Sequence, residues 1–197
     1  MISVVIPTLN AEQGLAATLS ALVPGVVEGL VCDVTIVDGG STDQTLQIAD
    51  QAGVHVLSTS ASRGTQLKAG AKNAKSPWLL FLHADTVLEP GWQQDVINFI
   101  EKIDDGRRPE ATAAFQFALD DDGFAPRLVE KFVGIRSTLL RMPYGDQGLL
   151  ISRALYNKVG GYQDIALMED VDIVRRLGRR RITILRSRAI TSAARYR

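Results

Sequence analysis

Four short β-rich runs alternate with helical segments in the first 90 residues, and this alternation is the strongest constraint on the fold. The runs are residues 2–6, 34–37, 54–57 and 78–82. Between the first two, Leu15, Leu19 and Leu22 recur on one face of a helix expected at 12–22. Strands that alternate with helices form a mostly parallel sheet covered by helices. We therefore predict an α/β fold, in which the apolar run 78–82 is a central strand.

The pattern changes after residue 90. Helices are expected at 91–103 and 126–140, and a third opens around Glu169 and Asp170. Strands are expected at 112–118, 149–152 and 182–185. The first of these alternates polar and apolar residues, as does a half-exposed antiparallel strand. This part of the chain therefore predicts a smaller antiparallel addition to the sheet.

The composition is that of one globular domain. A chain of 197 residues with 46% hydrophobic and 22% charged residues can bury one sizeable core. No apolar run approaches the roughly 20 residues that cross a bilayer, and the first residues lack a basic leader, so we expect a cytoplasmic protein. The single cysteine, Cys32, cannot form an internal disulfide and is expected to fill space beside a strand.

Charge is unevenly distributed along the chain. The last 23 residues, from Arg175 on, contain nine arginines and no acid, although the formal net charge of the whole chain is zero. Such an end suits anionic lipid, a diphosphate or nucleic acid, or is a solvated end without a partner. No aromatic stacking platform accompanies the arginines, which disfavours nucleic acid. We predict no nucleic-acid partner and peripheral contact with the inner face of a membrane.

Polar residues stand where three of the first four strands end. Thr8 and Asn10 follow the first strand, Asp38 the second, and His83 with Asp85 the fourth. In open α/β sheets, ligands bind in the crevice beyond the carboxyl ends of the strands. We therefore expect these side chains to converge on one cleft.

The residue types at these strand ends favour an acidic nucleotide site. Neither G-x-G-x-x-G after the first strand nor a P-loop motif is present. One acid, such as Asp38, can accept hydrogen bonds from a base or ribose, and another, such as Asp85, can hold a divalent cation that bridges a diphosphate. Each also has a structural alternative: Asp38 as a turn residue, Asp85 as a cap and His83 as a hydrogen-bonded support. Ser41 and Gln44 have the spacing of a capping box for the next helix.

Five segments, in order, resemble family 2 glycosyltransferases with the GT-A fold. They are VVIPTLN, DGGSTDQT, RGTQLKAGAKNA, LLFLHADT and MEDVDIVRRL. The resemblance implies a single Rossmann-like GT-A domain over residues 1–197, with a nucleotide-binding half at 1–90 and an acceptor-side half at 91–197. Relatives carry further helices beyond this point, which implies a truncated C-terminus. The wording of LHADT and YGDQG resembles a small bacterial branch linked to modified-sugar pathways such as arsenosugar synthesis.

For the nucleotide, the resemblance implies roles at individual positions. It implies that Pro7, Thr8 and Asn10 line the nucleotide pocket, that Asp38 contacts the base and that Arg63 lies near the nucleotide. Asp85 matches the last, metal-binding acid of the family's D-x-D signature, for Mg²⁺ or Mn²⁺. His83 stands where the first acid is usual, and either ligates the metal or bonds to a ribose or phosphate oxygen.

For the reaction, the resemblance implies inverting transfer of a sugar from a nucleotide-diphosphate sugar to an acceptor hydroxyl. Asp170 matches the family's catalytic base, with Glu169 as its support; the structural alternative is that Asp170 caps a helix. Asp172 is expected to pair with Arg175 or Arg176.

The loop PYGDQG is the remaining unusual segment. Asp146 and Gln147 in it are expected to touch the donor sugar or the acceptor, unless the loop is an ordinary glycine-rich turn.

Two rival functions stay open. A sugar nucleotidyltransferase would open with a glycine-rich basic loop, and TLNAEQG has no basic residue. A nucleotide-binding or membrane-associated scaffold would keep this fold without the chemistry.

Overall fold

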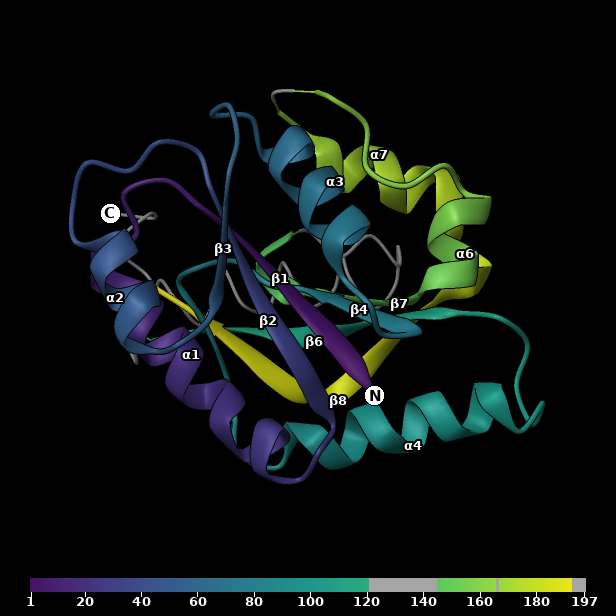
Figure 1. Cartoon of the computed structure of the whole chain (residues 1–197). Coiled ribbons are helices and arrows are strands. Elements are labelled where there is room, and N and C mark those ends of the chain that lie inside the picture. Colours follow the sequence, from purple (N-terminus) through teal and green to yellow (C-terminus); the bar gives the residue numbers. More distant parts are fainter. Residues whose placement is uncertain (121–144, 166, 193–197) are drawn as a thin grey trace.

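A single sheet organises the protein. The computed structural model describes residues 1–120, 145–165 and 167–192 (Figure 1). The sheet has eight strands in the order β3-β2-β1-β4-β7-β6-β8-β5. Their bounds are β1 Ile2–Thr8, β2 Val31–Asp38, β3 His55–Ser58, β4 Trp78–Phe81, β5 Thr86–Leu88, β6 Thr112–Leu119, β7 Leu149–Ser152 and β8 Ile182–Thr191.

The strands are mostly parallel. β3, β2, β1 and β4 are parallel neighbours, and β6 is parallel to β8. β7 is antiparallel to both β4 and β6, and β5 is antiparallel to β8. The predicted α/β class, with a mostly parallel sheet and an antiparallel part, is confirmed.

Helices cover both faces of the sheet, as Figure 1 shows. One face carries α1 (Glu12–Val27), α2 (Thr45–Gln51) and α4 (Trp92–Asp104). The other carries α3 (Arg63–Asn73), α6 (Arg153–Lys158) and α7 (Glu169–Leu177). Two short 3-10 turns, η1 (Gly145–Gln147) and η2 (Arg179–Arg181), precede β7 and β8.

The two faces have separate hydrophobic cores, and the central strands contribute to both. In β1, Val4 and Ile6 belong to the core on the side of α1, whereas Val5 belongs to the core on the side of α3. In β4, Leu80 and Leu79 divide in the same way. This alternation is why the run 78–82 is apolar at every position, as predicted for a strand covered on both sides.

The strand predicted at 112–118 is more buried than its pattern indicates. In β6 only Gln116 is exposed, so the prediction of a half-exposed strand was wrong. The antiparallel prediction holds for one neighbour, β7, because the other neighbour, β8, is parallel. β8 continues to Thr191, well beyond the predicted end at 185, and pairs with β6 as far as Leu119.

Three smaller predictions have different outcomes. Cys32 is exposed, so the expectation that it fills space beside a strand was wrong. The capping box was wrong as well, since α2 starts at Thr45 without a side-chain cap and the Ser41 hydroxyl donates to Asp38 instead. The helix expected at 126–140 lies outside the described residues.

The short link between β4 and β5 shows that the sheet curls. These strands are four places apart in the sheet, a separation of about 19 Å if the sheet were flat. The chain from Phe81 to Thr86 reaches about 18 Å when fully extended, and a turn in which the Thr86 N–H donates to the His83 carbonyl shortens it. The edge of the sheet therefore bends back toward the end of β4, where His83 and Asp85 lie.

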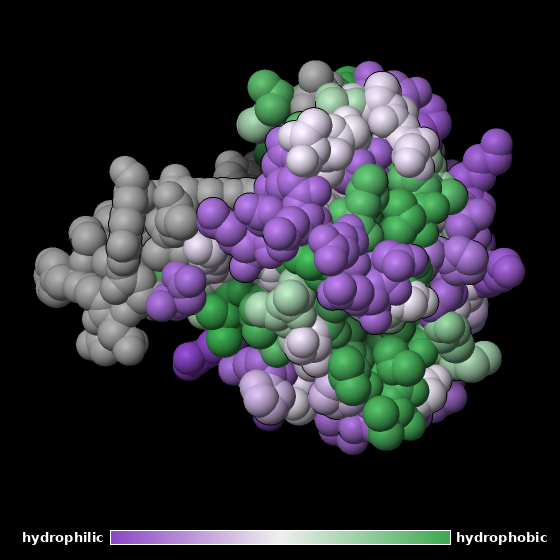
Figure 2. All heavy atoms as spheres, turned by 60° about the vertical axis from the view of Figure 1, so that its left-hand side comes forward, coloured by the Kyte–Doolittle hydropathy of each residue, from purple (hydrophilic) through white to green (hydrophobic). Residues whose placement is uncertain are grey.

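The surface is mixed in character. Figure 2 shows hydrophilic residues interspersed with green hydrophobic patches on the side of the molecule that lies at the left in Figure 1. Val23, Val26 and Val27 at the end of α1 are among the exposed large apolar residues. None of the helices in the described ranges is both long and apolar enough to cross a membrane.

Candidate active site

A cavity of about 1000 Å³ brings most of the predicted site residues together. It is open at the carboxyl ends of β1 and β4 and is bounded on another side by the start of α7. The predicted residues in its wall are Pro7, Thr8, Asn10, Arg63, His83, Asp85, Glu169 and Asp170. The wall thus combines residues from both predicted halves of the chain.

The backbone that carries His83 and Asp85 is held by α1. The Thr18 hydroxyl donates to the carbonyl of Ala84 at 2.9 Å. A Cβ added to Gly14 would lie 2.8 Å from the Cα of Asp85, so only glycine permits this close approach. The position of the two half-buried side chains is therefore set by the packing of α1 against the β4–β5 link.

The donor set around Asp85 fits a divalent cation that is shared with a substrate. A carboxylate and an imidazole are suitable ligands for Mn²⁺, and Mg²⁺ is usually held by one or two carboxylates together with phosphate oxygens and water. In the ranges that the structure describes, no three His, Cys, Asp or Glu side chains form a metal-binding group. Asp85 and His83 would therefore be two ligands of a cation, and a diphosphate would supply further oxygens.

Glu169 and Asp170 begin α7 at the opposite wall. Glu169 is 3% exposed, and its Oε1 lies 3.6 Å from the Nε of Arg63. Burial raises the pKa of Glu169, against the lowering effects of its own backbone N–H and of Arg63, and the neighbouring Asp170 adds to the rise. The half-buried Asp170 accepts a hydrogen bond from the Val171 N–H at 2.7 Å. Asp170 thus reaches the cavity while Glu169 anchors the helix start.

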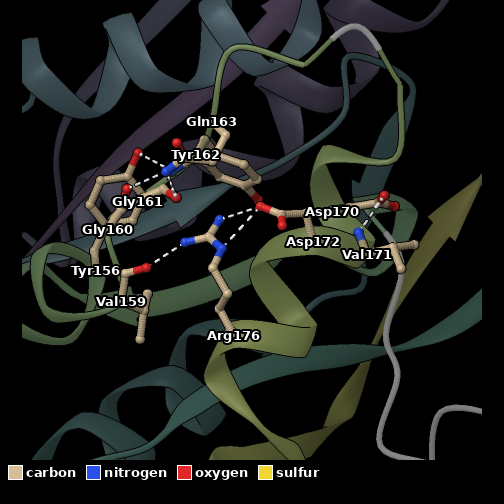
Figure 3. A network of polar contacts seen from close by, with 10 residues as sticks. All are labelled: Tyr156, Val159, Gly160, Gly161, Tyr162, Gln163, Asp170, Val171, Asp172 and Arg176. Atoms are coloured by element: carbon tan, nitrogen blue, oxygen red, sulfur yellow. Dashed lines mark hydrogen bonds and ion pairs between the residues drawn. The ribbon is translucent and has the colours of Figure 1, made fainter.

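An ion pair and hydrogen bonds hold the first turn of α7, as Figure 3 shows. Arg176 pairs with Asp172, its Nε 3.0 Å from Oδ2, and also donates to the carbonyl of Val159. The predicted pairing of Asp172 is thereby confirmed for Arg176. On the other side, a Cβ on Gly64 would lie 2.2 Å from the carbonyl oxygen of Gln163. The segment before α7 therefore touches the start of α3.

Asp38 is buried beside the cavity and outside its wall. The side chain is 2% exposed. Its Oδ1 accepts from the hydroxyls of Thr8 at 2.9 Å and Ser41 at 2.5 Å. Its Oδ2 accepts from the N–H groups of Gly40 at 2.9 Å and Ser41 at 2.8 Å. Three of these bonds hold the loop after β2 and the fourth joins Asp38 to β1, so contact with a base stays a prediction that would require Asp38 to exchange one of them.

This network makes Asp38 a pH-dependent contributor to stability. Burial by itself raises the pKa of Asp38, but the hydrogen bonds from Ser41, Gly40 and Thr8 outweigh it and lower the pKa. Because the folded pKa lies below the unfolded value, the stabilisation is present above the unfolded pKa and is lost as the pH falls through the folded pKa.

We expect Asp38→Asn to lower the free energy of unfolding by about 2 to 3 kcal/mol at pH 7, because an amide nitrogen cannot accept these bonds. Urea unfolding at pH 7 and at successively lower pH measures this, and the difference from wild type should shrink in acid. Asp50→Asn, at an exposed position of α2, is the control and should change little. A loss independent of pH would contradict the role of the ionised carboxylate.

Asp146 and Gln147 are not among the described residues that line the cavity. Both belong to η1. Gln147 is fully buried, and its Nε2 donates to the carbonyl of Phe115 at 2.9 Å. The Asp146 carbonyl accepts from the Thr191 hydroxyl at 3.3 Å. In this arrangement they join η1 to β6 and β8, and their contact with a sugar or an acceptor stays a prediction.

The cavity also includes residues that sequence reasoning missed. Gln66 lies in its wall although it is 5% exposed. The available signal is a polar residue on the apolar face of α3, beside Leu67 and Gly70. Glu12 and Asp43 are in the wall too. The Glu12 carboxylate accepts from the Gln44 N–H, and the Asp43 carboxylate accepts from the Glu12 N–H, each at 3.0 Å. These bonds join the segments that follow β1 and β2.

Comparison with known sequences finds a matching family and related proteins. Residues 3–112 match the family model described as Glycosyl transferase family 2. A PGL/p-HBAD biosynthesis glycosyltransferase of Mycobacterium tuberculosis is 35% identical over 95 residues, which cover 45% of this chain and 36% of the relative. An uncharacterized glycosyltransferase of Haemophilus influenzae is 23% identical over 111 residues, which cover 53% and 34%. The chain thus matches about a third of the length of these relatives.

Solved structures share the fold. Staphylococcus aureus TarS 1–349 in complex with UDP has a TM-score of 0.73 at 19% identity, covering 98% of this chain and 61% of that one. Glucosyl-3-phosphoglycerate synthase of Mycobacterium tuberculosis, in complex with Mn²⁺, UDP and glucosyl-3-phosphoglycerate, has a TM-score of 0.63 at 21% identity, covering 98% and 70%. The resemblance to an arsenosugar-type branch stays a prediction. Since the family model spans more than half of the residues, the chain belongs to glycosyl transferase family 2.

Proposed function

We propose that the protein transfers a sugar from a nucleotide-diphosphate sugar to an acceptor hydroxyl, with inversion at the anomeric carbon. One observation carries the proposal: Asp85 with His83 from the β4–β5 link, and Asp170 from the start of α7, line the same cavity. Its volume of about 1000 Å³ suits a nucleotide sugar together with part of an acceptor. In this proposal the donor residues lie mainly in the half at 1–90, and the base lies in the half at 91–197.

The proposed chemistry is a single displacement. The acceptor oxygen attacks the anomeric carbon from the face opposite the diphosphate, and the bond from that carbon to the diphosphate breaks as the new one forms. Asp170 takes the proton of the acceptor hydroxyl. Glu169, held by Arg63, keeps the helix start in place. Asp85 and His83 would hold Mg²⁺ or Mn²⁺, which supplies charge neutralisation for the departing diphosphate.

The fold relatives indicate which donor to test first. TarS was solved with UDP and with UDP-GlcNAc, and glucosyl-3-phosphoglycerate synthase with UDP and Mn²⁺. Their identities of 17–21% are too low to transfer a substrate, so a uridine donor with Mn²⁺ is a starting point for this chain.

We also propose that the arginine-rich end makes peripheral contact with a membrane. Arg179–Arg181 form η2, immediately before β8. The first residues of β8 and β6 pair with each other, at the end of the sheet away from the strand ends that line the cavity. An anionic surface bound there would leave the cavity open. A cytoplasmic location is likewise an expectation.

A panel of UDP-, GDP-, dTDP- and CDP-sugars, each with and without Mn²⁺, tests the function by thermal shift and product analysis. We expect one nucleotide class at 100 times its Kd to raise Tm by about 5 to 10 °C, and by less without Mn²⁺. NMR of the product should show inverted anomeric configuration. A retained configuration would exclude the single displacement, and no response to any donor would refute the function.

A further inference from the structure

Gln66 is a buried polar side chain in the cavity wall, and its amide is held in one orientation. It is 5% exposed, and its Nε2 donates to the carbonyls of Thr8 at 2.8 Å and Val37 at 2.7 Å. Of the two amide atoms only the nitrogen is a donor, so two carbonyl partners determine which side the nitrogen occupies. The oxygen, Oε1, must therefore point away from both strand ends.

Oε1 is left as an acceptor toward the cavity. Among the described residues no donor bonds to it, and the atom is not sealed from solvent. Because Gln66 lines the cavity, the route by which Oε1 reaches solvent is the cavity itself. A ligand that fills this space without a donor would bury an unsatisfied oxygen, whereas an N–H donor would satisfy it.

The position of Gln66 along the cavity is where a base would lie. Its two carbonyl partners are at the ends of β1 and β2, whereas Asp85 and His83 follow β4 on the other side of β1. Two strand spacings amount to about 10 Å. With the diphosphate at Asp85, a ribose would bridge this span and bring the base to Gln66.

The surroundings of Gln66 are small residues. Ala61 lies in the wall beside it, and a Cβ on Gly39 would come within 3.1 Å of the Ala61 Cα and 3.2 Å of the Gln66 Nε2. Glycine at 39 thus leaves the amide in place. Asp38 already accepts four hydrogen bonds, three within its own loop and one from Thr8 of β1, whereas the Gln66 Oε1 accepts none from the described residues at this end of the cavity.

We propose that Gln66 reads the base: its Oε1 accepts a hydrogen bond from a ring N–H, so the cavity selects uracil, thymine or guanine. Uracil and thymine carry this hydrogen on N3, and guanine on N1. The corresponding nitrogens of cytosine and adenine are acceptors, so neither can donate a hydrogen bond to Oε1. This inference rests on the proposed function, because it assigns the nucleotide end of the same site.

Calorimetric titration of the full chain with Mn²⁺ tests the proposal through base selectivity. For wild type we expect UDP to bind about tenfold or more tightly than N3-methyl-UDP and CDP, as expected when a buried acceptor loses its donor. If guanine is the base, GDP is compared with N1-methyl-GDP and ADP. In Gln66→Leu the ratio should fall to about 1 or 2. A purely structural role would weaken all nucleotides equally and leave the ratio unchanged.

Gln93→Leu is the matched control. Gln93 is also 5% exposed, but it lies on α4 outside the described wall and its Nε2 donates to Glu28. Its variant should keep the wild-type ratio. Wild-type binding of N3-methyl-UDP as tight as that of UDP, with N1-methyl-GDP as tight as GDP, overturns the inference alone, even if Gln66→Leu fails to fold. Binding of none of these nucleotides overturns the proposed function as well.

Discussion

Replacing Asp170 by asparagine should lower kcat by about 1,000-fold and leave the affinity for the donor nucleotide within about twofold. General-base catalysis contributes roughly 10² to 10⁴ in rate, and an amide cannot take the acceptor proton. The substitution keeps the size of a side chain that is half-buried and bonded to the Val171 N–H. Steady-state kinetics with the responding donor, together with calorimetry of the nucleotide, measures both quantities.

Asp172→Asn is the control for this result. Asp172 is on the same helix and lies outside the described cavity wall, and asparagine can still accept hydrogen bonds from Arg176, so its variant should keep kcat within about threefold. Turnover by Asp170→Asn at the wild-type rate would remove the base assignment and leave the nucleotide site intact. A wild-type protein that binds the nucleotide but transfers to no acceptor would favour the scaffold alternative.

Replacing Asp85 by alanine should weaken nucleotide-diphosphate binding about 100-fold in Mn²⁺, because the variant removes the carboxylate that would hold the cation against the diphosphate. The backbone of this segment is held by Thr18 and by the close approach of Gly14, so the loss is expected to be local. Calorimetry at several Mn²⁺ concentrations measures the effect.

Titration in EDTA is the internal control for Asp85. Without a divalent cation, wild type and Asp85→Ala should bind the nucleotide alike. A difference that persists in EDTA would show that Asp85 contacts the nucleotide directly or supports the wall. His83→Gln extends the test, because a ligating imidazole predicts a changed preference between Mn²⁺ and Mg²⁺, whereas a hydrogen bond to ribose predicts equal weakening with both ions.

Local patterns in the chain are enough to predict the α/β class and the strand-end side chains of the cavity wall. Apolar runs that alternate with helical segments impose a parallel sheet, and the carboxyl ends of its strands share one edge. Thr8, His83 and Asp85 could therefore be placed together without coordinates. Glu169 and Asp170 depended on the resemblance to a family, because a helix start by itself does not indicate which strand ends it faces.

Only the tertiary structure shows which polar side chains already have hydrogen-bond partners inside the protein. Asp38 and Gln147 stand in suggestive motifs, yet each is buried and bonded to groups remote in sequence or within its own loop. Gln66 has no distinctive pattern, and it becomes a candidate only because two strand ends hold its nitrogen. Hydrogen-bond partners across 30 to 60 residues depend on how the sheet curls and how α1 and α3 pack on it, and no local periodicity encodes those contacts.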